Sequence, residues 1–321
     1  MGQVTQPGSK REALASTVAR STPDRRPLAL SLILLVRPKQ WSKNLLVFAA
    51  FIFTASFHDP EAIRNVLVAF AALCLASSFV YVLNDLLDVK SDRLHPRKKY
   101  RPIASGAVSA PLAAGIAAIA LAGSASLSLL LNHTSMAVLG TYVVLQVLYN
   151  FGLKKVAVAD VFLISLGFIL RAALGAAALS VTISSWLLFC TGALALMLGF
   201  SKRRSEFILL GDQRGEVRES LAAYSKGALD ALVVMFACGA ALCYGVYAVQ
   251  SPTAHRYPGL ILTTVFVFYG ICRYVLIVFG KDEGGEPETL LYRDPHLLFS
   301  IVMFIIAAVL AMSGVKVPLV E

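Results

Sequence analysis

Charged side chains are scarce in this sequence, and acidic ones are the scarcest. Asp, Glu, Lys and Arg make up 15% of the 321 residues, whereas 57% are hydrophobic and the mean hydropathy is +0.72. A soluble globular domain of this length carries a larger charged share on its surface. The composition therefore excludes a soluble globule and indicates an integral membrane protein.

Cysteine is also rare, and its spacing is not that of a reactive or metal-binding site. All five cysteines lie inside apolar runs, and no CxxC pair occurs. They are Cys74, Cys190, Cys238, Cys243 and Cys272. This pattern excludes a disulfide framework and a zinc site, so we expect small core residues at these positions.

The apolar residues are grouped into segments that are long enough to cross a membrane. Residues 1–27 lack such a segment, and we expect them to form a disordered cytoplasmic arm ahead of a single transmembrane domain, residues 28–321. The first apolar segment, 27–36, is too short to span and is followed by cations and Trp41, which is typical of an interfacial helix. Nine spanning helices are predicted at about 44–57, 63–88, 110–131, 135–151, 158–179, 185–200, 227–249, 258–279 and 296–314.

The basic residues lie almost entirely on one side of this predicted topology. Of the 29 Lys and Arg residues, all but five fall in the N-terminal arm or in the connections on its side of the membrane. The exceptions are Arg64, Arg256 and Lys316 on the opposite side, and Arg171 and Arg273 within spans. The positive-inside rule places the basic side in the cytoplasm, with the protein in the cytoplasmic (inner) membrane. Because topology accounts for the net charge of +10, we expect no nucleic-acid partner.

Three aspartates gather where the second predicted span ends. Asp85, Asp88 and Asp92 fall on one narrow face of a helix at 100° per residue. Carboxylates crowded in this way repel one another unless a cation lies among them, and hard oxygen ligands suit Mg²⁺. The alternative is a solvated helix end, which leaves three costly ionisable groups beside apolar sequence without an explanation. We therefore predict a magnesium site that faces the cytoplasm.

A second charged cluster follows the sixth predicted span and is basic instead of acidic. Lys202, Arg203 and Glu206 belong to it, and Tyr224 lies at the start of the next span. Fixed cations there would complement a metal-bound diphosphate by binding a separate phosphate. The alternative is that these cations only reach toward lipid headgroups.

Further polar residues lie at or within neighbouring spans. Tyr149 and Lys154 close the fourth span, and Arg171 lies deep in the fifth. A buried membrane cation needs a partner, which we expect to be either a substrate phosphate or one of the acids. All three are candidate substrate-binding residues.

The motifs around the first cluster resemble those of a known family. Asn84-Asp85-x-x-Asp88-x-x-x-Asp92, ending in Arg101-Pro102-Ile103-Ala104-Ser105-Gly106, is similar to the first aspartate-rich motif of the UbiA superfamily of intramembrane prenyltransferases. The resemblance implies an all-α polytopic fold with about nine transmembrane helices around a central cavity, which the charged clusters indicate is open to the cytoplasm. Typical members carry a second DxxxD motif, whereas this chain has Lys202-Arg203-Arg204-Ser205-Glu206 there.

That departure resembles the decaprenyl-phosphate phosphoribosyltransferase branch of the superfamily. The resemblance implies Mg²⁺-dependent transfer of 5-phosphoribosyl from 5-phosphoribosyl 1-diphosphate (PRPP) to a polyprenyl phosphate, with diphosphate as the other product. It is a step of cell wall biosynthesis in the best-known setting. Under this reading Asp85, Asp88 and Asp92 hold Mg²⁺. The remaining substrate-binding residues would be Lys43, Asn84, Lys98, Arg101, Tyr149, Lys154, Arg171, Lys202, Arg203, Glu206 and Tyr224.

Two other functions stay open at the level of the sequence. A prenyltransferase joining an isoprenyl diphosphate to an aromatic acceptor would use the same first motif, but should need a second carboxylate cluster. A transporter for an anionic solute would show inverted repeats or interrupted spans in matching halves, and neither is visible. Lipid chain length, the downstream pathway and the choice between monomer and homo-oligomer are also left open.

Overall fold

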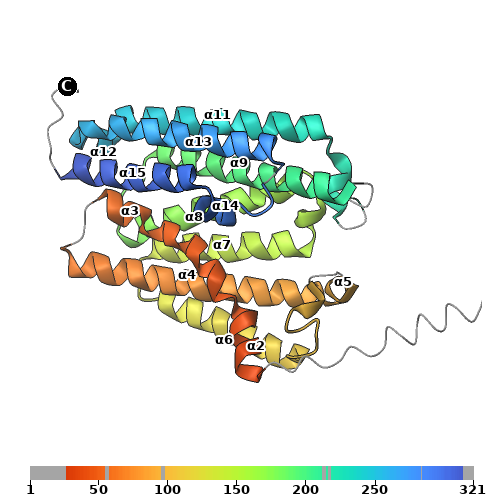
Figure 1. The fold of residues 1–321 in the computed structure, drawn as a ribbon. Coiled ribbons are helices and arrows are strands. Elements are labelled where there is room, and N and C mark those ends of the chain that lie inside the picture. The colour runs from red at the N-terminus through yellow and green to blue at the C-terminus, as the bar shows by residue number, and fades with distance from the viewer. Residues whose placement is uncertain are drawn as a thin grey trace, which may run out of the picture. The chain divides into compact units, whose positions relative to one another are not determined.

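The structure is a computed structural model that describes residues 27–54, 58–94, 98–211, 215, 218–282 and 284–313. Every regular element in these ranges is a helix, as predicted (Figure 1). The arm expected at residues 1–27 lies outside the described residues except for Pro27. By contacts the chain divides into two compact units, residues 1–40 with 77–121 and residues 41–76 with 122–321.

Eight helices are long and apolar enough to cross a membrane. They are α4 (Pro60–Leu87), α6 (Ala110–Ser128), α7 (His133–Phe151), α8 (Ala159–Ala178), α9 (Ser185–Leu210), α11 (Lys226–Gln250), the pair η6 (Pro258–Leu262) and α13 (Thr263–Gly280), and α15 (Pro295–Met312). Eight of the nine predicted spans correspond to these helices. The chain is therefore an integral membrane protein with about nine apolar segments.

The predicted span at 44–57 has a different local structure. The chain there forms a 3₁₀ helix, η1 (Pro38–Val47), which runs directly into the short helix α3 (Phe48–Phe53). The short helix expected at 27–36 is present as α2 (Leu28–Val36).

The first unit contains α2, the C-terminal part of α4, α5 (Val89–Leu94), η2 (Lys98–Tyr100) and the first part of α6. Its core joins Leu35, Val82, Ile103 and Val108 with two alanines of α6. The segment after η2 is a compact turn, in which Val108 N donates to Pro102 O at 2.9 Å. This unit contains all three predicted metal ligands.

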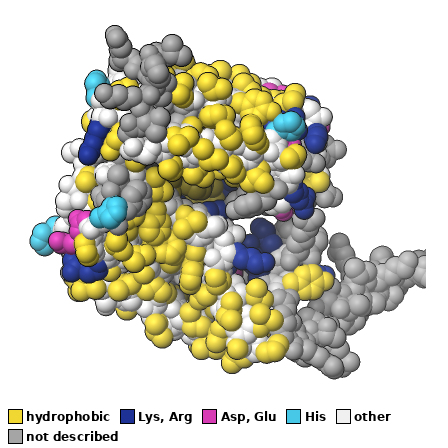
Figure 2. Space-filling view, turned by 60° about the vertical axis from the view of Figure 1, so that its left-hand side comes forward, with side chains coloured by type: hydrophobic (Ala, Val, Ile, Leu, Met, Phe, Trp, Pro, Cys, Tyr) yellow, Lys and Arg dark blue, Asp and Glu magenta, His cyan; other side chains and the backbone are white. Residues whose placement is uncertain are grey.

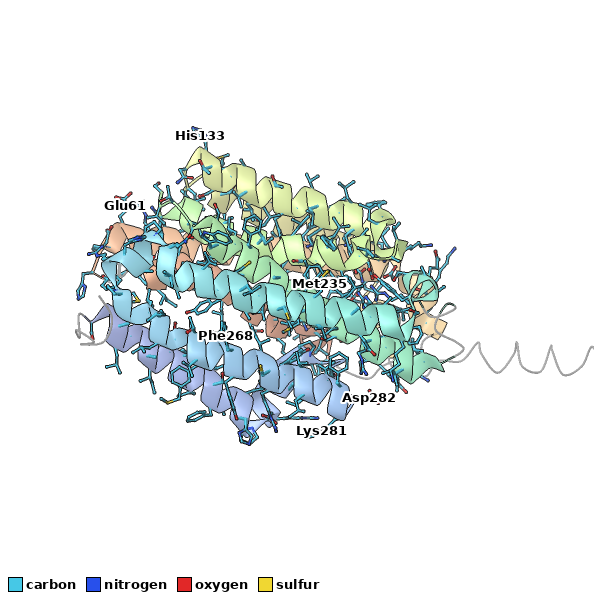
Figure 3. All side chains as sticks on the ribbon, turned by 90° about the horizontal axis from the view of Figure 1, so that it is seen from above. Glu61, His133, Met235, Phe268, Lys281 and Asp282 are labelled. Carbon is cyan, nitrogen blue, oxygen red and sulfur yellow. The ribbon has the colours of Figure 1, made fainter. Side chains whose placement is uncertain are left out.

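The second unit is a helical bundle in which neighbours along the chain pack side by side (Figure 1). α7 packs on α8, α8 on α9, α9 on α11, α11 on α13, and α13 on α15. Figure 3 shows Glu61 and His133 at one end of these helices and Lys281 and Asp282 at the opposite end. The remaining short helices are η3 (Leu153–Lys155), η5 (Glu219–Ala223), α12 (Pro252–Arg256) and α14 (Pro287–Arg293).

The outer surface is apolar, as expected for contact with lipid. Leu242, Val265 and Leu276 are each more than 60% exposed. Hydrophobic side chains also cover much of the face seen in Figure 2. In water such a surface would be an aggregation site, whereas in a bilayer it costs nothing.

Candidate active site

The acidic cluster lies where α4 ends and α5 begins. α4 stops at Leu87 and Asp88 forms a turn, so the single continuous helix assumed from the spacing is interrupted. Helical hydrogen bonds nevertheless cross the junction: Asp88 N donates to Asn84 O at 2.9 Å, and Asp92 N donates to Asp88 O at 2.8 Å. Asp85 and Asp92 are buried and Asp88 is half-buried. The near-helical path keeps Asp85 and Asp92 within reach of one common partner.

That partner is Arg101. Its Nη1 donates to Asp85 Oδ1 at 3.1 Å and to Asp92 Oδ2 at 2.6 Å. The turn that follows positions it: Pro102 and Ile103 are buried, and Gly106 closes the turn with a φ of +81°, which glycine adopts without strain. The predicted site residue Arg101 therefore reaches the acidic cluster.

Arg37 is a second partner that the sequence reasoning did not place in the site. Its Nη2 donates to Asp85 Oδ1 at 2.6 Å, and its guanidinium lies 5.1 Å from the ring centroid of Tyr81. Arg37 caps α2 with a left-handed φ of +54°, a costly conformation for a residue with a Cβ. The position of Arg37 between an apolar segment and Pro38 can be seen in the sequence. Its contact with Asp85, 48 residues later, cannot.

The two arginines bear directly on the predicted metal site. Within the described ranges no group of three or more His, Cys, Asp or Glu side chains is placed to hold a metal ion. In this structure arginines instead pair with two of the three expected metal ligands, Asp85 and Asp92. Asp85 Oδ2, however, is buried and accepts no hydrogen bond from any described residue. Such an oxygen fits a cation that takes few protein ligands and completes its shell with water and phosphate oxygens, as Mg²⁺ does.

Two other predicted residues belong to this unit. Asn84 is half-buried on α4, one turn before Asp88, and Lys98 is exposed in η2. Residues 95–97, which connect α5 to η2, lie outside the described residues.

The second cluster is centred on a buried carboxylate, Asp160, in the first turn of α8. Asp160 is fully buried and its Oδ2 accepts from Arg203 Nε at 2.8 Å, Ser220 Oγ at 3.1 Å and Arg218 Nη2 at 3.4 Å. Tyr224 OH donates to Asp160 Oδ1 at 3.5 Å. One carboxylate thus joins α8, α9 and the segment around η5.

Glu206 and Tyr149 complete this cluster. Glu206 Oε2 accepts from Arg203 Nη1 at 2.7 Å, and Arg218 Nη2 donates to Tyr149 OH at 3.4 Å. The structure therefore brings together four predicted site residues, Tyr149, Arg203, Glu206 and Tyr224. The sequence analysis did not include Asp160, Arg218 or Ser220 among the site residues. Asp160 could have been found from its position, because it is an acid at the start of an apolar span.

Tyr224 lies just outside the membrane-spanning helices. Burial raises the pKa of its hydroxyl above the usual value of 10. Tyr224 therefore stays a neutral donor and acceptor at physiological pH, and its oxygen accepts from Val158 N. This bond holds the residue before α8, which has a left-handed φ of +67°.

The remaining basic residues of this region differ in their surroundings. Lys202 is exposed on α9, and Lys154 is half-buried in η3. Arg204 is buried and donates to Asp230 at 2.6 Å, to Asp282 at 2.8 Å and to Val278 O at 2.9 Å. Arg204 therefore fastens α9 to α11 and to the end of α13.

Arg171 lies deep in α8, as predicted, but its partners are neutral. Its Nε donates to Asn44 Oδ1 at 3.0 Å and its Nη2 to Tyr142 OH at 3.0 Å. Its guanidinium also lies 5.0 Å from the ring centroids of Tyr142 and Phe168. Within the described residues no acid pairs with it, so of the two expected partners the acidic one is not found.

A large apolar cavity lies within the second unit. Its volume is about 610 Å³, and it is lined mostly by apolar residues of α8, α9, α11, α13 and α15. Lys43 and Ser42 of η1 contribute to its wall, so one predicted site residue faces hydrocarbon-lined space. A cavity of this size with a cation in its wall suits an amphiphile with an anionic head.

These features define an all-helical integral membrane protein with clustered, ion-paired charges at the ends of its spans. The chain belongs to the UbiA prenyltransferase family, whose model matches residues 45–293. It is thus an integral membrane transferase, as the sequence motifs predicted.

Individual relatives are similar over most of the chain. A decaprenyl-phosphate phosphoribosyltransferase of Mycolicibacterium smegmatis is 33% identical, covering 83% of this chain and 87% of the relative. The enzyme of the same name from Corynebacterium glutamicum is 31% identical, covering 88% and 87%. Among solved structures, a UbiA homologue from Archaeoglobus fulgidus bound to GPP and Mg²⁺ superposes with a TM-score of 0.69 at 16% identity, covering 88% of this chain and 99% of that one. At that identity the likeness shows the fold alone.

Proposed function

We propose that this protein transfers the 5-phosphoribosyl group of PRPP to a polyprenyl phosphate of decaprenyl type, in a Mg²⁺-dependent reaction. The observation that carries the proposal is the likeness to relatives named decaprenyl-phosphate phosphoribosyltransferase, at 31–33% identity over more than four fifths of the chain. The charges of the second cluster support it. A prenyltransferase with two metal sites needs a second cluster with an excess of acids, whereas here Asp160 and Glu206 are balanced by Arg203 and Arg218.

The bond changes explain which groups the reaction needs. The bond between ribose C1 and the diphosphate oxygen breaks, and diphosphate leaves with the electron pair. An oxygen of the lipid phosphate forms the new bond to C1 through an oxocarbenium-like transition state. Because a phosphate monoester is already anionic at neutral pH, the reaction needs no base to activate the nucleophile. Stabilising the leaving charge is then the main catalytic task.

The acidic cluster is the proposed site of that stabilisation. Asp85, Asp88 and Asp92 would hold Mg²⁺, which when bound would neutralise charge on the diphosphate. Arg37 and Arg101 would hold Asp85 and Asp92 in a fixed orientation, because each carboxylate accepts a charge-assisted hydrogen bond of 2.6 Å.

The apolar cavity is the proposed site for the lipid acceptor. Its wall offers hydrocarbon contact for the polyprenyl chain, and Lys43 offers a cation for the phosphate. The remaining exposed or half-exposed cations, Lys98, Lys154 and Lys202, would contribute to binding the anionic PRPP. Because PRPP is water-soluble and these cations belong to the basic side of the topology, we place the reaction at the cytoplasmic face of the cytoplasmic membrane.

The test is a transfer assay on the purified protein in detergent. Radiolabelled PRPP, polyprenyl phosphate and Mg²⁺ are incubated together and extracted with organic solvent. We expect label in the lipid phase only when all three components are present, and its loss with EDTA. Coupling of an isoprenyl diphosphate to an aromatic acceptor, with no label transferred from PRPP, would overturn the proposal in favour of a prenyltransferase.

A further inference from the structure

The buried part of the second cluster is electrically balanced, which argues against phosphate binding by its arginines. Two acids, Asp160 and Glu206, are paired there with two bases, Arg203 and Arg218, whereas Lys202 lies exposed outside this network. The Arg203 side chain is only 3% exposed, and its Nε and Nη1 are already bonded to the two acids. A guanidinium used in this way offers little to another anion. The role of Arg203 is therefore to hold the carboxylates.

Glu206 is the member of the cluster that reaches outward. Its side chain is 26% exposed, whereas those of Arg203 and Asp160 are 3% and 0% exposed. Glu206 Oε2 lies 2.7 Å from Arg203 Nη1 and 3.9 Å from Arg218 Nη1. Glu206 Oε1 has no hydrogen bond to any residue that the structure describes. The Glu206 carboxylate is thus held through one oxygen while its side chain stays partly exposed.

The chemistry of Glu206 Oε1 limits what it can bind. A carboxylate oxygen binds either a cation or a hydrogen-bond donor. Because Arg203 and Arg218 already balance the charges of Asp160 and Glu206, a neutral donor suits this oxygen better than a further cation. A phosphate oxyanion would be repelled, and a hydrocarbon would leave the oxygen desolvated without a partner, which is costly. A sugar hydroxyl satisfies both requirements, and a ribosyl donor carries two of them on adjacent carbons.

We propose that Glu206 accepts hydrogen bonds from the ribose hydroxyls of the donor substrate and so determines its specificity. The inference rests on the proposed phosphoribosyl transfer. Arg203 and Arg218 hold the carboxylate in its rotamer, and Asp160 holds both arginines. An isoprenyl diphosphate has no hydroxyl to offer at this position, so the same residue disfavours it.

The test compares PRPP with its 2-deoxy and 3-deoxy analogues on the wild-type enzyme and on Glu206→Gln. We expect wild type to prefer PRPP over at least one analogue by roughly 10- to 100-fold in kcat/KM, the range for a hydrogen bond to a charged group. Glu206→Gln should lose most of that preference, because its kcat/KM for PRPP should fall more than its kcat/KM for the analogue. Glu219→Gln is the matched control, because Glu219 forms an exposed ion pair with Lys155 and should keep the wild-type preference.

The outcomes separate this inference from the function on which it rests. No phosphoribosyl transfer by wild type refutes the proposed function itself. Transfer with equal kcat/KM for PRPP and both analogues overturns the role of Glu206, and this result needs no variant to fold. An equal loss of kcat/KM for all three substrates in Glu206→Gln would mean that Glu206 only holds the cluster together. An unchanged preference for PRPP in this variant would mean that another residue binds the hydroxyls.

Discussion

Replacing Gly175 by alanine is expected to separate α8 from the segment that carries Lys43. A Cβ built on Gly175 would lie 1.9 Å from Val47 O and 2.8 Å from Val47 C, which are backbone atoms without rotamer freedom. Real Cβ contacts essentially never fall below 3.0 Å, so the two backbones would move apart by about 1.1 Å. That movement lengthens the 3.0 Å bond between Arg171 and Asn44 beyond hydrogen-bonding distance.

The stability cost of Gly175→Ala has two parts, the steric overlap with Val47 and the lost hydrogen bond between Arg171 and Asn44. Overpacking of this kind costs about 1–3 kcal/mol, and a hydrogen bond to a charged group contributes about 1.5–3 kcal/mol. Alanine regains about 1 kcal/mol of helix propensity over glycine. The net loss is about 1.5–5 kcal/mol, which for 321 residues corresponds to a decrease of roughly 2–7 °C in Tm.

Thermal unfolding of the detergent-solubilised protein measures this change. Gly140→Ala is the matched control, since Gly140 lies in α7 with nothing within 4 Å of its added Cβ and should leave Tm unchanged or slightly raised. A Gly175→Ala variant that unfolds at the wild-type temperature would refute the close backbone contact between α8 and η1.

Three further predictions concern single charged residues. Asp85→Asn should reduce the transfer rate by about 10²- to 10³-fold, because it removes the negative charge that would bind the cation and that pairs with both arginines. Asp59→Asn, just before α4, is the control and should keep the wild-type rate. Equal rates for the two variants would refute the proposed site. Arg171→Gln should lower Tm but leave KM for PRPP unchanged, and the reverse result would indicate direct substrate contact. The Arg273 guanidinium lowers the pKa of Asp294 from 3.8 to about 2, so this carboxylate stabilises the folded state above pH 4 and loses that contribution as pH falls toward 2. Tm should accordingly fall more steeply over that range in wild type than in Asp294→Asn, and parallel curves would contradict the pairing.

The acidic and basic clusters show two different uses of buried arginine. Arg37 and Arg101 pair with carboxylates of the proposed metal site, one oxygen of which stays unpaired. Arg203 and Arg218 instead balance the charges of Asp160 and Glu206, so this buried network carries no net charge. Counting charges along the sequence treats both clusters alike, whereas their pairing differs, and this difference supports the separate roles proposed for them.

The sequence by itself determined the membrane-spanning helices and the face shared by Asp85 and Asp92. Both depend on local information: apolar length sets where a span can form, and helical periodicity sets which residues lie on one side. The predicted span at 63–88 accordingly matches α4 at Pro60–Leu87. The family motifs are local in the same sense, which is why they were readable without a structure.

Only the tertiary structure decided which charges meet. Arg37 lies 48 residues from Asp85, and Asp160 is joined to residues 43 to 64 positions later in the chain, so no periodicity connects them. The same contacts explain where the predicted boundaries differed. α9 continues ten residues past the predicted end at 200, because acids from three other parts of the chain pair with the arginines of its polar segment. Hydropathy measures the cost of burying a charge, but the partner that offsets it is supplied by packing.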